Sequence, residues 1–316
     1  MQKKHVCILG ASGFVGTHLT SRLVKAGHHV TALTRNRERN RHLLVLPTVR
    51  VVTTDVHDTD ALKANFSGCD AVINLIGLLN QSRKEKFSQA HVELTRKVVE
   101  AAEDASVKHI LHVSALKADS KNGPSEYLKT KGQAEDILRE QDRIGVTIFQ
   151  PSLIFGPDDS FINRFADLLS LPSPWFLLPT PNTRFAPIYV GDVVSAIETS
   201  LNDRSTMGQV YELCGPKVLS LKEIVLYIRN HLGKDTKILG LGQGLSKLVA
   251  WLLEWVPGKP MSVDNFLSMQ THSICGTNGL EKLGIAATPM ESIVPRMLTS
   301  SDRKGRLSVY RRTAGR

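Results

Sequence analysis

Three glycines near the N-terminus constrain the fold more than any other feature of the sequence. They lie in the run Gly10-Ala-Ser-Gly13-Phe-Val-Gly16, which follows a short apolar segment and leads directly into a helical pattern. Glycine permits positive φ and close approach of the backbone to a ligand, and a helix N-terminus offers free N–H groups to phosphate. The order of strand, glycine turn and helix therefore predicts a βαβ unit that binds a phosphate group. The alternative is a tight turn without a ligand.

The first 150 residues alternate between short apolar runs and helical patterns. The runs lack polar alternation, as expected of strands buried on both faces. They are His5–Gly10, His29–Thr34, Val49–Thr53, Ala71–Ile76, His109–Ser114 and Val146–Gln150, with helical patterns at Gly13–Ala26, Lys84–Ala105 and Glu126–Arg143. Repeated βα units with right-handed crossovers predict an α/β domain with a doubly wound parallel sheet, Rossmann-type, over residues 1–150.

The alternation of strand-like and helical patterns ends after Pro151. Residues 151–189 hold seven prolines and one helical stretch, Phe161–Leu171, which indicates loops over the sheet edge. Residues 190–298 are mostly helical, with strand-like runs at Gln209–Cys214 and Thr236–Leu239. We expect a smaller, mostly helical C-terminal lobe over residues 151–300, interleaved with the sheet edge and binding a substrate or partner. Residues 301–316 form a basic tail that we expect to be mobile.

Composition excludes several protein classes. With 41% hydrophobic and 22% charged residues, the chain is neither disordered nor fibrous. The net charge of +10 favours an anionic partner such as a nucleotide, a phosphoester, nucleic acid or an acidic membrane face. No nucleic-acid-reading module or interleaving of basic and aromatic residues accompanies that charge, so we do not expect nucleic-acid binding.

The four cysteines are far apart and form no CxxC motif. Cys7 and Cys69 lie in apolar runs, where buried free thiols are expected, and Cys214 and Cys275 have no nearby partner in sequence. This usage indicates a reducing compartment and no disulfide framework, and we expect no metal site. No targeting segment or apolar run of membrane-spanning length is visible, so we expect a cytoplasmic protein.

The residues after the second strand predict the cofactor. A site for NAD ordinarily has Asp or Glu at this strand end, to hold the ribose 2′-hydroxyl. Here Thr34 is followed by Arg35, Arg37, Arg39 and Arg41. Arginine suits a 2′-phosphate through forked, charge-assisted hydrogen bonds, so we predict NADP(H) in preference to NAD(H). A solvated basic helix start would explain Arg39 and Arg41, but it would not explain the missing acid.

Two further strand ends supply candidate cofactor contacts. Asp55 and Val56 follow the third strand, where they could meet the adenine ring, although Asp55 could equally cap the next helix. The segment Asn74-Leu-Ile76-Gly77 ends the fourth strand, where its backbone could line the cofactor.

A serine, a tyrosine and a lysine suggest proton transfer. Ser114 ends the fifth strand, and Tyr127 and Lys131 follow with the i, i+4 spacing that places both on one helix face. An ammonium group beside a phenol favours the phenolate, so Tyr127 could exchange a proton with a carbonyl or hydroxyl. Lys131 could also bind the nicotinamide ribose, and Ser114 could orient the substrate oxygen. The alternative for Tyr127 and Lys131 is a surface helix pair.

Several motifs over residues 5–300 together carry a family resemblance. They are Gly10–Gly16, Val72-Ile-Asn-Leu-Ile-Gly77, His112-Val-Ser114, Tyr127-Leu-Lys-Thr-Lys131, Gln150-Pro-Ser-Leu-Ile-Phe-Gly-Pro157, Phe161-Ile-Asn-Arg-Phe165 and Ala186-Pro-Ile-Tyr-Val-Gly-Asp-Val193. With them the chain resembles the extended short-chain dehydrogenase/reductase superfamily. Within it, the chain is most similar to the atypical branch that contains the NADPH-binding accessory subunit of mitochondrial respiratory complex I and bacterial relatives.

The resemblance implies a site at the carboxyl ends of the strands. It places Ser114, Tyr127 and Lys131 in the catalytic positions, and it carries the segment after Pro151 past the nicotinamide. Together with the residue-level argument, the expected cofactor-binding residues are Gly10, Ser12, Gly13, Phe14, Val15, Gly16, Arg35, Asp55, Val56, Asn74, Ile76, Gly77, Lys131 and Pro151.

The sequence departs from the catalytic relatives at one helix. Those of the extended type often carry an Asn-containing pattern after the fourth strand, where this chain has His91-Val-Glu-Leu-Thr95. The alternative for His91 is a half-buried helix histidine. Members of the branch that this chain resembles keep the residues equivalent to Tyr127 and Lys131, but they have no well-defined reaction.

Two functions therefore stay open. The first is an NADP(H)-dependent oxidoreductase or epimerase-like enzyme that acts on an unknown small-molecule substrate. The second is a non-catalytic NADPH-binding subunit in peripheral contact with a respiratory complex or with the inner face of the membrane. Two apolar segments, Pro172–Pro179 and the helical pattern Gly244–Trp255, bear on this choice. Leu245, Leu248, Val249, Leu252 and Leu253 of the second segment would either pack into the core or form an interfacial helix.

Overall fold

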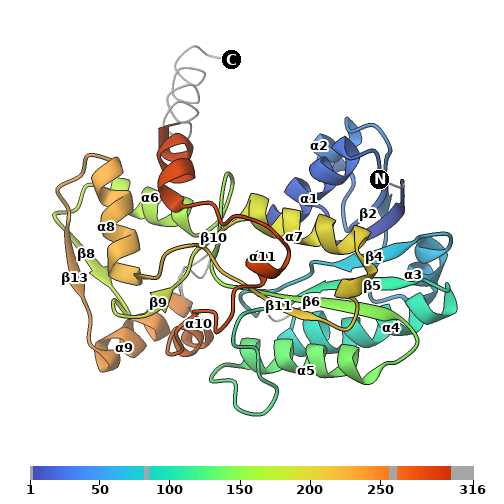
Figure 1. Cartoon of the computed structure of the whole chain (residues 1–316). Helices are drawn as coiled ribbons and strands as arrows, with labels where there is room; N and C mark the ends of the chain where they lie inside the picture. The colour runs from blue at the N-terminus through green and yellow to red at the C-terminus, as the bar shows by residue number, and fades with distance from the viewer. Residues whose placement is uncertain (1–2, 82–84, 256–261, 300–316) are drawn as a thin grey trace.

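The computed structural model describes residues 3–81, 85–255 and 262–299. The predicted basic tail lies outside the described residues. A seven-stranded sheet in the order β11-β6-β5-β4-β1-β2-β3 dominates the fold, and all its pairs are parallel (Figure 1). Its strands are β1 (His5–Leu9), β2 (His29–Thr34), β3 (Val49–Thr53), β4 (Ala71–Asn74), β5 (His109–Val113), β6 (Gly145–Pro151) and β11 (Val210–Leu213).

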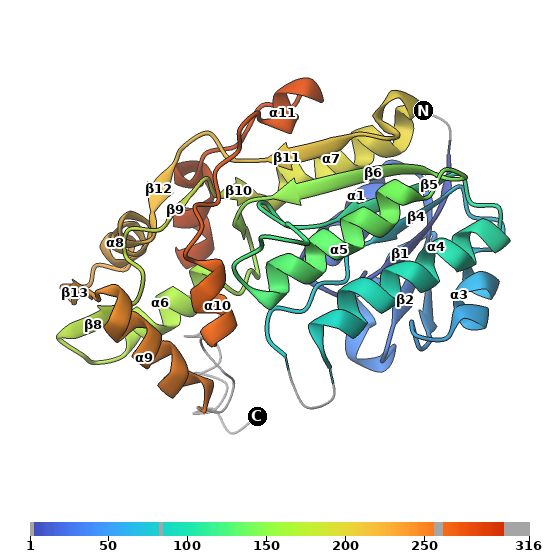
Figure 2. The same cartoon turned by 90° about the horizontal axis from the view of Figure 1, so that it is seen from below.

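Helices cover both faces of this sheet, as a doubly wound fold requires (Figure 2). One face is covered by α1 (Phe14–Lys25), the short α2 (Arg41–Leu44) and α7 (Val190–Asn202). The other face is covered by α3 (Thr59–Phe66), α4 (Leu94–Asp104) and α5 (Glu126–Glu140). Alternate residues of β1 point into the two cores, Val6 and Ile8 into one and Cys7 and Leu9 into the other.

The predicted strands of the first 150 residues are confirmed, each within two residues at either end. The helical pattern predicted over Lys84–Ala105 is a π-helical segment, Ser88–Glu93, that continues into α4. The predicted Glu126–Arg143 helix ends earlier, at Glu140. There the Gln141 side chain bonds both the N–H (2.9 Å) and the C=O (2.7 Å) of Ile144 and turns the chain toward β6. The strand predicted at Gln209–Cys214 forms β11 and pairs with β6, so the sheet is completed only after residue 150.

The C-terminal residues also build a smaller lobe with its own core. Its larger elements are α6 (Ile162–Ser170), β8 (Trp175–Leu178), α8 (Leu221–His231), β13 (Lys237–Gly240), α9 (Gln243–Glu254) and α10 (Val263–Ser268). Short strand pairs join them: β7 (Ile154–Phe155) with β10 (Ile188–Tyr189), β9 (Arg184–Phe185) with β12 (Leu219–Ser220), and β8 with β13. The segment α11 (Gly279–Lys282) lies against β11 before the chain enters a last helix at residue 290. No helix in the described ranges is both long and apolar enough to span a bilayer.

The expectation of no disulfide was wrong. Cys214 at the end of β11 is bonded to Cys275, which lies 61 residues further along the chain. Only the fold brings these residues to a Cα–Cα distance of 6.1 Å, because the return segment after α10 passes the sheet edge at this point. Cys7 and Cys69 are buried free thiols, as predicted.

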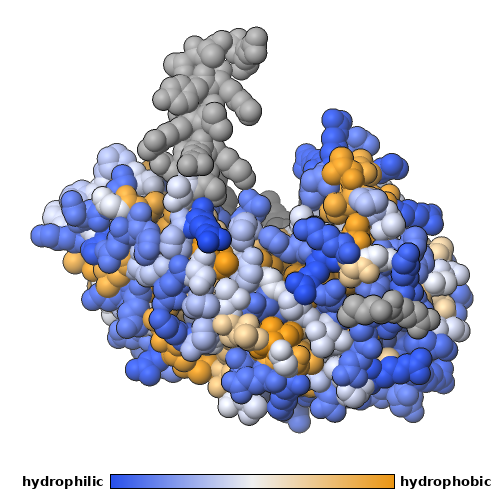
Figure 3. All heavy atoms as spheres, turned by 45° about the horizontal axis from the view of Figure 1, so that its top comes forward, coloured by the Kyte–Doolittle hydropathy of each residue, from blue (hydrophilic) through white to orange (hydrophobic). Residues whose placement is uncertain are grey.

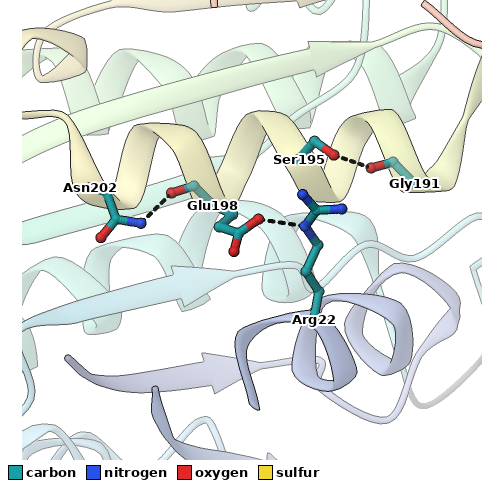
Figure 4. A network of polar contacts seen from close by, with 5 residues as sticks. All are labelled: Arg22, Gly191, Ser195, Glu198 and Asn202. Atoms are coloured by element: carbon teal, nitrogen blue, oxygen red, sulfur yellow. Dashed lines mark hydrogen bonds and ion pairs between the residues drawn. The ribbon is translucent and has the colours of Figure 1, made fainter. Parts of the chain in front are cut away.

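Charged and polar side chains dominate the face in Figure 3, where apolar residues form small separate groups. An ion pair in which the arginine is half exposed helps fix α1 against α7. Arg22 Nε donates to Glu198 Oε2, and Asn202 Nδ2 donates to the carbonyl of Glu198 (2.9 Å) on the same helix (Figure 4). This contact secures the helix that follows the glycine turn.

Candidate cofactor and proton-transfer site

The glycine turn lies where the chain crosses the centre of the sheet. β1 has β2 on one side and β4 on the other, so the connections after β1 and β4 leave the sheet in opposite directions. Such a switch point opens a crevice at the carboxyl ends of the strands, where α/β proteins bind ligands. The segments Gly10–Gly16 and Asn74–Gly77 follow these two strands and are therefore neighbours.

The backbone of this turn requires glycine at two places. Gly10 has φ +81°, and a Cβ there would lie 3.2 Å from the backbone carbon of Leu75. A Cβ on Gly16 would lie 2.2 Å from the carbonyl oxygen of Gly10, so α1 can press against the turn only without a side chain. Gly13 is the N-cap of α1, and no side chain caps the helix. The first N–H groups of α1 are thus left for an anionic ligand.

The glycine turn is bordered by residues of the first 150 positions and by a segment that follows them. Ser12, Phe14 and Val15 are partly exposed. The ring of Phe14 packs edge-on against His18, whose Nε2 lies 3.2 Å from the carbonyl oxygen of Pro157. The segment after β7 therefore borders the turn.

The arginine segment lies at the carboxyl end of β2. The side chain of Arg35 is 80% exposed and forms an ion pair with Glu85. Thr34 is buried, and its hydroxyl accepts hydrogen bonds from Asn36 N (3.3 Å) and Asn40 Nδ2 (2.9 Å). Thr34 thus holds the turn that presents the arginines at the carboxyl end of β2.

Asp55 does not cap the helix after β3. That helix, α3, is capped by Asp58, whose carboxylate accepts from Asp60 N (3.0 Å) and Ala61 N (3.1 Å). Asp55 is exposed at the strand end and accepts from His57 N (2.9 Å), while Val56 packs on the core. The capping alternative for Asp55 was wrong.

The end of β4 is shaped by Asn74 and by Lys131. Asn74 is buried, and its Oδ1 accepts from Ile76 N at 3.1 Å. The Nζ atom of Lys131 donates to the carbonyls of Val113 (3.0 Å) and Ile76 (3.3 Å), so it joins the ends of β5 and β4. A Cβ on the exposed Gly77 would lie 3.5 Å from that Nζ.

Tyr127 and Lys131 lie on α5, but their pKa values do not shift as the sequence predicts. Burial raises the pKa of Tyr127 to about 12, and the nearby carboxylate of Asp264 adds to the effect. Burial lowers the pKa of Lys131 to about 8, against the opposing effect of Glu135. The expected lowering of the Tyr127 pKa by the ammonium is not found, because burial and the Asp264 carboxylate both raise this pKa. The tyrosine is therefore a protonated phenol at neutral pH.

Ser114 is buried just beyond β5. Its N–H donates to the carbonyl of Phe149 at 2.8 Å. Its Oγ lies near the carboxylate of Glu135 without a hydrogen bond of good geometry. Burial raises the pKa of Glu135, and the nearby Ser114 hydroxyl partly opposes that shift. Pro151 ends β6 nearby, and its carbonyl accepts from Leu116 N at 3.0 Å. Ser114, Lys131 and Pro151 thus meet at the ends of β5 and β6.

His91 belongs to this site, and its half-buried interpretation was wrong. The ring is 1% exposed, and both its nitrogens are engaged. Nε2 accepts from Leu78 N (3.1 Å), so Nδ1 carries the proton and donates to Thr130 Oγ1 (2.9 Å). The ring packs edge-on against Tyr127 with centroids 5.6 Å apart. Burial, helped by the charge of Lys131, lowers the pKa of His91 to about 2, so it is neutral.

Two carboxylates of the site escaped the sequence analysis. Glu135 is buried one turn beyond Lys131, and Gln150 Nε2 donates to its oxygens at 2.8 and 2.9 Å. Its i, i+4 spacing from Lys131 could have indicated it. Asp264, from the C-terminal lobe, accepts from Glu126 N (2.8 Å) and Tyr127 N (3.3 Å) and so caps α5. No sequence signal joins residues so far apart.

The chain is similar to proteins of several named kinds. A family model described as NAD(P)H-binding matches residues 10–160. The chain is 28% identical over 296 residues to mouse mitochondrial NADH dehydrogenase (ubiquinone) 1 alpha subcomplex subunit 9, covering 90% of this chain and 77% of that protein. It is 26% identical to the N-acetyl-α-D-glucosaminyl-diphospho-ditrans,octacis-undecaprenol 4-epimerase of Escherichia coli O157:H7, covering 86% of each.

A solved structure shows the same fold. A dTDP-glucose 4,6-dehydratase from Streptomyces venezuelae with NAD bound superposes with a TM-score of 0.75 over 93% of this chain and 96% of that one, at 19% identity. Residues 10–160 thus match an NAD(P)H-binding family model, the whole chain has the fold of the dehydratase, and it is homologous over most of its length to mitochondrial complex I subunits of this kind.

Proposed function

We propose that this protein is an NADP(H)-dependent oxidoreductase or epimerase-type enzyme with Tyr127 as its acid and base. The observation that carries the proposal is that Lys131, one helical turn from Tyr127, binds the carbonyl of Ile76, whose backbone the glycine turn also approaches at Gly10. Gly10 and Gly16 leave the space that a cofactor pyrophosphate needs, because a Cβ at either position would meet backbone. A bound nicotinamide would supply the hydride.

The residues of the chain handle the proton. The Tyr127 phenol, with a pKa of about 12, is protonated at neutral pH and suits donation to a carbonyl oxygen during reduction. Lys131 is fixed by two backbone carbonyls within one helical turn of Tyr127, where it can also bind a ribose hydroxyl. The buried Oγ of Ser114 has no hydrogen bond of its own and can orient the oxygen that receives the proton.

Preference for NADP(H) rests on the end of β2. Arg35, Arg37 and Arg39 are exposed beside the crevice, and the acid that would bind a free ribose 2′-hydroxyl is absent at Thr34. A 2′-phosphate would replace Glu85 as the partner of Arg35 and gain a charge-assisted fork. We therefore assign Arg35 as the residue that selects the phosphorylated cofactor, with Asp55 and Val56 toward the adenine.

Turnover tests the enzymatic proposal. NADPH consumption is measured with a panel of nucleotide sugars and of isoprenoid-linked carbonyl compounds, with wild type and Tyr127→Phe in parallel. The phenylalanine variant removes only the hydroxyl, so we expect it to bind NADPH as the wild type does and to lose activity at least a hundredfold, the usual range for general acid–base catalysis. Equal rates for both proteins would reject the role of Tyr127.

The homology to complex I subunits favours a second candidate. As an accessory subunit, the chain would bind NADPH without turnover, and the cofactor would stabilise the fold by linkage. The mouse relative is named for ubiquinone and the E. coli relative for undecaprenol, and both of these molecules carry isoprenoid chains that reside in membranes. We propose that this protein also acts peripherally at the inner face of a membrane.

Fractionation tests the second candidate. If the chain is an accessory subunit, the native protein co-migrates with a large respiratory assembly after mild detergent extraction. A free protein that turns over a substrate would reject a purely structural role.

A further inference from the structure

Helix α9 exposes its large apolar side chains instead of burying them. They are half or more exposed at Leu245, Leu248, Trp251 and Leu252, and Trp255 after the helix end is 78% exposed. The side chains that face the protein are small: Ser246 and Ala250 are fully buried. A surface helix ordinarily turns its apolar stripe to the core, so α9 is oriented the opposite way. The sequence left two interpretations of this helix open, packing into the core and an interfacial helix. Packing into the core is wrong for Leu245, Leu248 and Leu252.

Hydrogen bonds fix this orientation. Ser246 Oγ accepts from Thr180 N at 3.2 Å and donates to the carbonyl of Leu241, also at 3.2 Å. Both bonds lie on the buried side of α9. The helix therefore cannot roll its leucines inward without breaking two buried polar contacts, and the outward apolar face is a built feature of the lobe.

All tryptophans of the chain lie on this part of the molecule. There are three, and Trp175, Trp251 and Trp255 are 60%, 51% and 78% exposed. Trp175 lies on β8, where the same strand face exposes Leu177, and its neighbour β13 exposes Leu239. The β8–β13 pair and α9 lie together at the end of the lobe farthest from the main sheet (Figures 1 and 2). We call this set of exposed apolar residues on β8, β13 and α9 the tryptophan surface.

The charges beside the tryptophan surface are mainly positive. Lys234, Lys237 and Lys247 are exposed, against one exposed acid, Asp235. Glu254 is half-buried, with its Oε2 3.5 Å from Val263 N. The chain as a whole carries +10. An exposed face of Trp and Leu with lysines at its border fits an anionic lipid surface, because Trp rings favour the headgroup region and lysines reach lipid phosphates.

We propose that the tryptophan surface docks the protein peripherally on an anionic bilayer. The rings and leucines enter the headgroup boundary, while Lys234, Lys237 and Lys247 face lipid phosphates. This docking surface rests on the proposed peripheral action at a membrane, and it specifies which part of the protein meets the lipid. It does not depend on cofactor binding or turnover, since the surface is built by other elements than the glycine turn and α5.

Tryptophan fluorescence tests the proposal without labels, because every tryptophan of the chain belongs to the surface. The full-length protein is mixed with vesicles of phosphatidylcholine and phosphatidylglycerol in equal amounts. We expect the emission to move to shorter wavelength and to be quenched when the lipids carry bromine on their acyl chains. The triple variant Leu245→Gln, Leu248→Gln and Leu252→Gln keeps all three tryptophans, and we expect its partitioning to fall at least tenfold.

A matched control separates the surface from general hydrophobicity. Val45 and Val218 are 79% and 47% exposed and lie outside the tryptophan surface. We expect Val45→Gln with Val218→Gln to partition as the wild type does. Adsorption that salt abolishes, without an emission shift, would overturn the proposal, as would an unaffected triple variant. A purified protein partner that seats on the wild-type surface while vesicles do not would also overturn it.

NADPH titration of the triple variant keeps the two proposals distinct. We expect the wild-type affinity, since the altered residues are outside the cofactor site. If the triple variant loses vesicle binding but still binds NADPH, the altered residues act in the tryptophan surface and not in the cofactor site. Absence of NADPH binding in both proteins would count against the proposed function and leave the surface proposal standing.

Discussion

Both ring nitrogens of His91 are held, and the contacts join two parts of the site. Nε2 binds the loop after β4 through Leu78 N, and Nδ1 binds α5 through Thr130, next to Lys131. A neutral imidazole suits this bridge because it accepts on one side and donates on the other. At the residue scale, His91 therefore keeps the loop after β4 and helix α5 at a fixed distance.

His91→Phe should loosen this bridge while keeping the aromatic packing. The partly buried Leu78 N–H would lose its acceptor, so we expect a loss of about 1–2 kcal/mol in the free energy of unfolding, measured with urea. His91→Gln, whose amide can both accept and donate, should recover part of it. Equal stability of the phenylalanine variant and the wild type would show that the two hydrogen bonds contribute nothing.

The buried histidines predict acid sensitivity. Burial lowers the pKa of His91 to about 2 and of His109 to about 4, and it lowers the pKa of His112 well below its usual value. The unfolded chain therefore takes up protons near the ordinary pKa of 6.5, whereas the native protein does not. These groups stabilise the native state above that pH and lose their contribution as the pH falls toward the native values.

Urea unfolding between pH 7 and 5 measures this effect. Three histidines give a limiting slope of about 4 kcal/mol per pH unit below the unfolded pKa. For the variant His109→Gln, the slope of the free energy of unfolding against pH should be smaller by the contribution of one proton. A free energy of unfolding that does not change with pH over this range would contradict the burial of neutral imidazoles.

At the scale of elements, α5 depends on a residue far away in sequence. Ser125 caps the helix through Leu128 N (3.2 Å), and Asp264 of α10 accepts from the preceding N–H groups, Glu126 and Tyr127. A contact between hydroxyls, Ser268 Oγ to Ser125 Oγ at 2.7 Å, fastens α10 beside them. The small lobe thus sets the start of the helix that carries Tyr127.

Asp264→Ala removes the acceptor for two helix N–H groups. We expect a loss of about 1–2 kcal/mol in the free energy of unfolding, as for other lost N-caps. The pKa of Tyr127 should also move down, because the Asp264 charge raises it. Asp235→Ala, an exposed acid of the same lobe, is the control and should change neither quantity. An unaltered Asp264→Ala protein would show that α10 does not support α5.

Elements with local signals were predictable, and those set by distant contacts were not. The strands of the first 150 residues followed from apolar runs, and the glycine turn followed from its place after β1. The π-helical segment at Ser88–Glu93 has no such signal, because the buried contacts of His91 lie with Leu78 and Thr130. The neutral His91, the raised Tyr127 pKa and the cap from Asp264 likewise depend on burial and on approach across the chain.

At the scale of the whole molecule, a covalent bond ties the sheet edge to the return segment. Cys214 directly follows β11, and Cys275 precedes α11, which packs on β11. Closing a loop of 61 residues in the unfolded chain is worth about 4 kcal/mol by chain entropy.

Removing the disulfide tests how much it contributes to the free energy of unfolding. Cys214→Ser with Cys275→Ser should lower the free energy of unfolding by about 4 kcal/mol in urea, and a reducing agent should destabilise the wild type to the same level. Cys69→Ser, which alters a free thiol, is the control for the loss of a cysteine. A reductant that leaves the wild-type transition unmoved would mean that the bond does not support the native fold.

Calorimetric titration of the cofactor-free protein decides whether the crevice after β1, β2 and β4 binds NADP(H). NADPH is titrated first and NADH second, with wild type and Arg35→Asp. We predict that the wild type binds NADPH at least tenfold more tightly than NADH, a difference of about 1.4 kcal/mol, and that Arg35→Asp reverses or abolishes the preference. Binding of neither dinucleotide, or tighter binding of NADH by the wild type, would contradict the account.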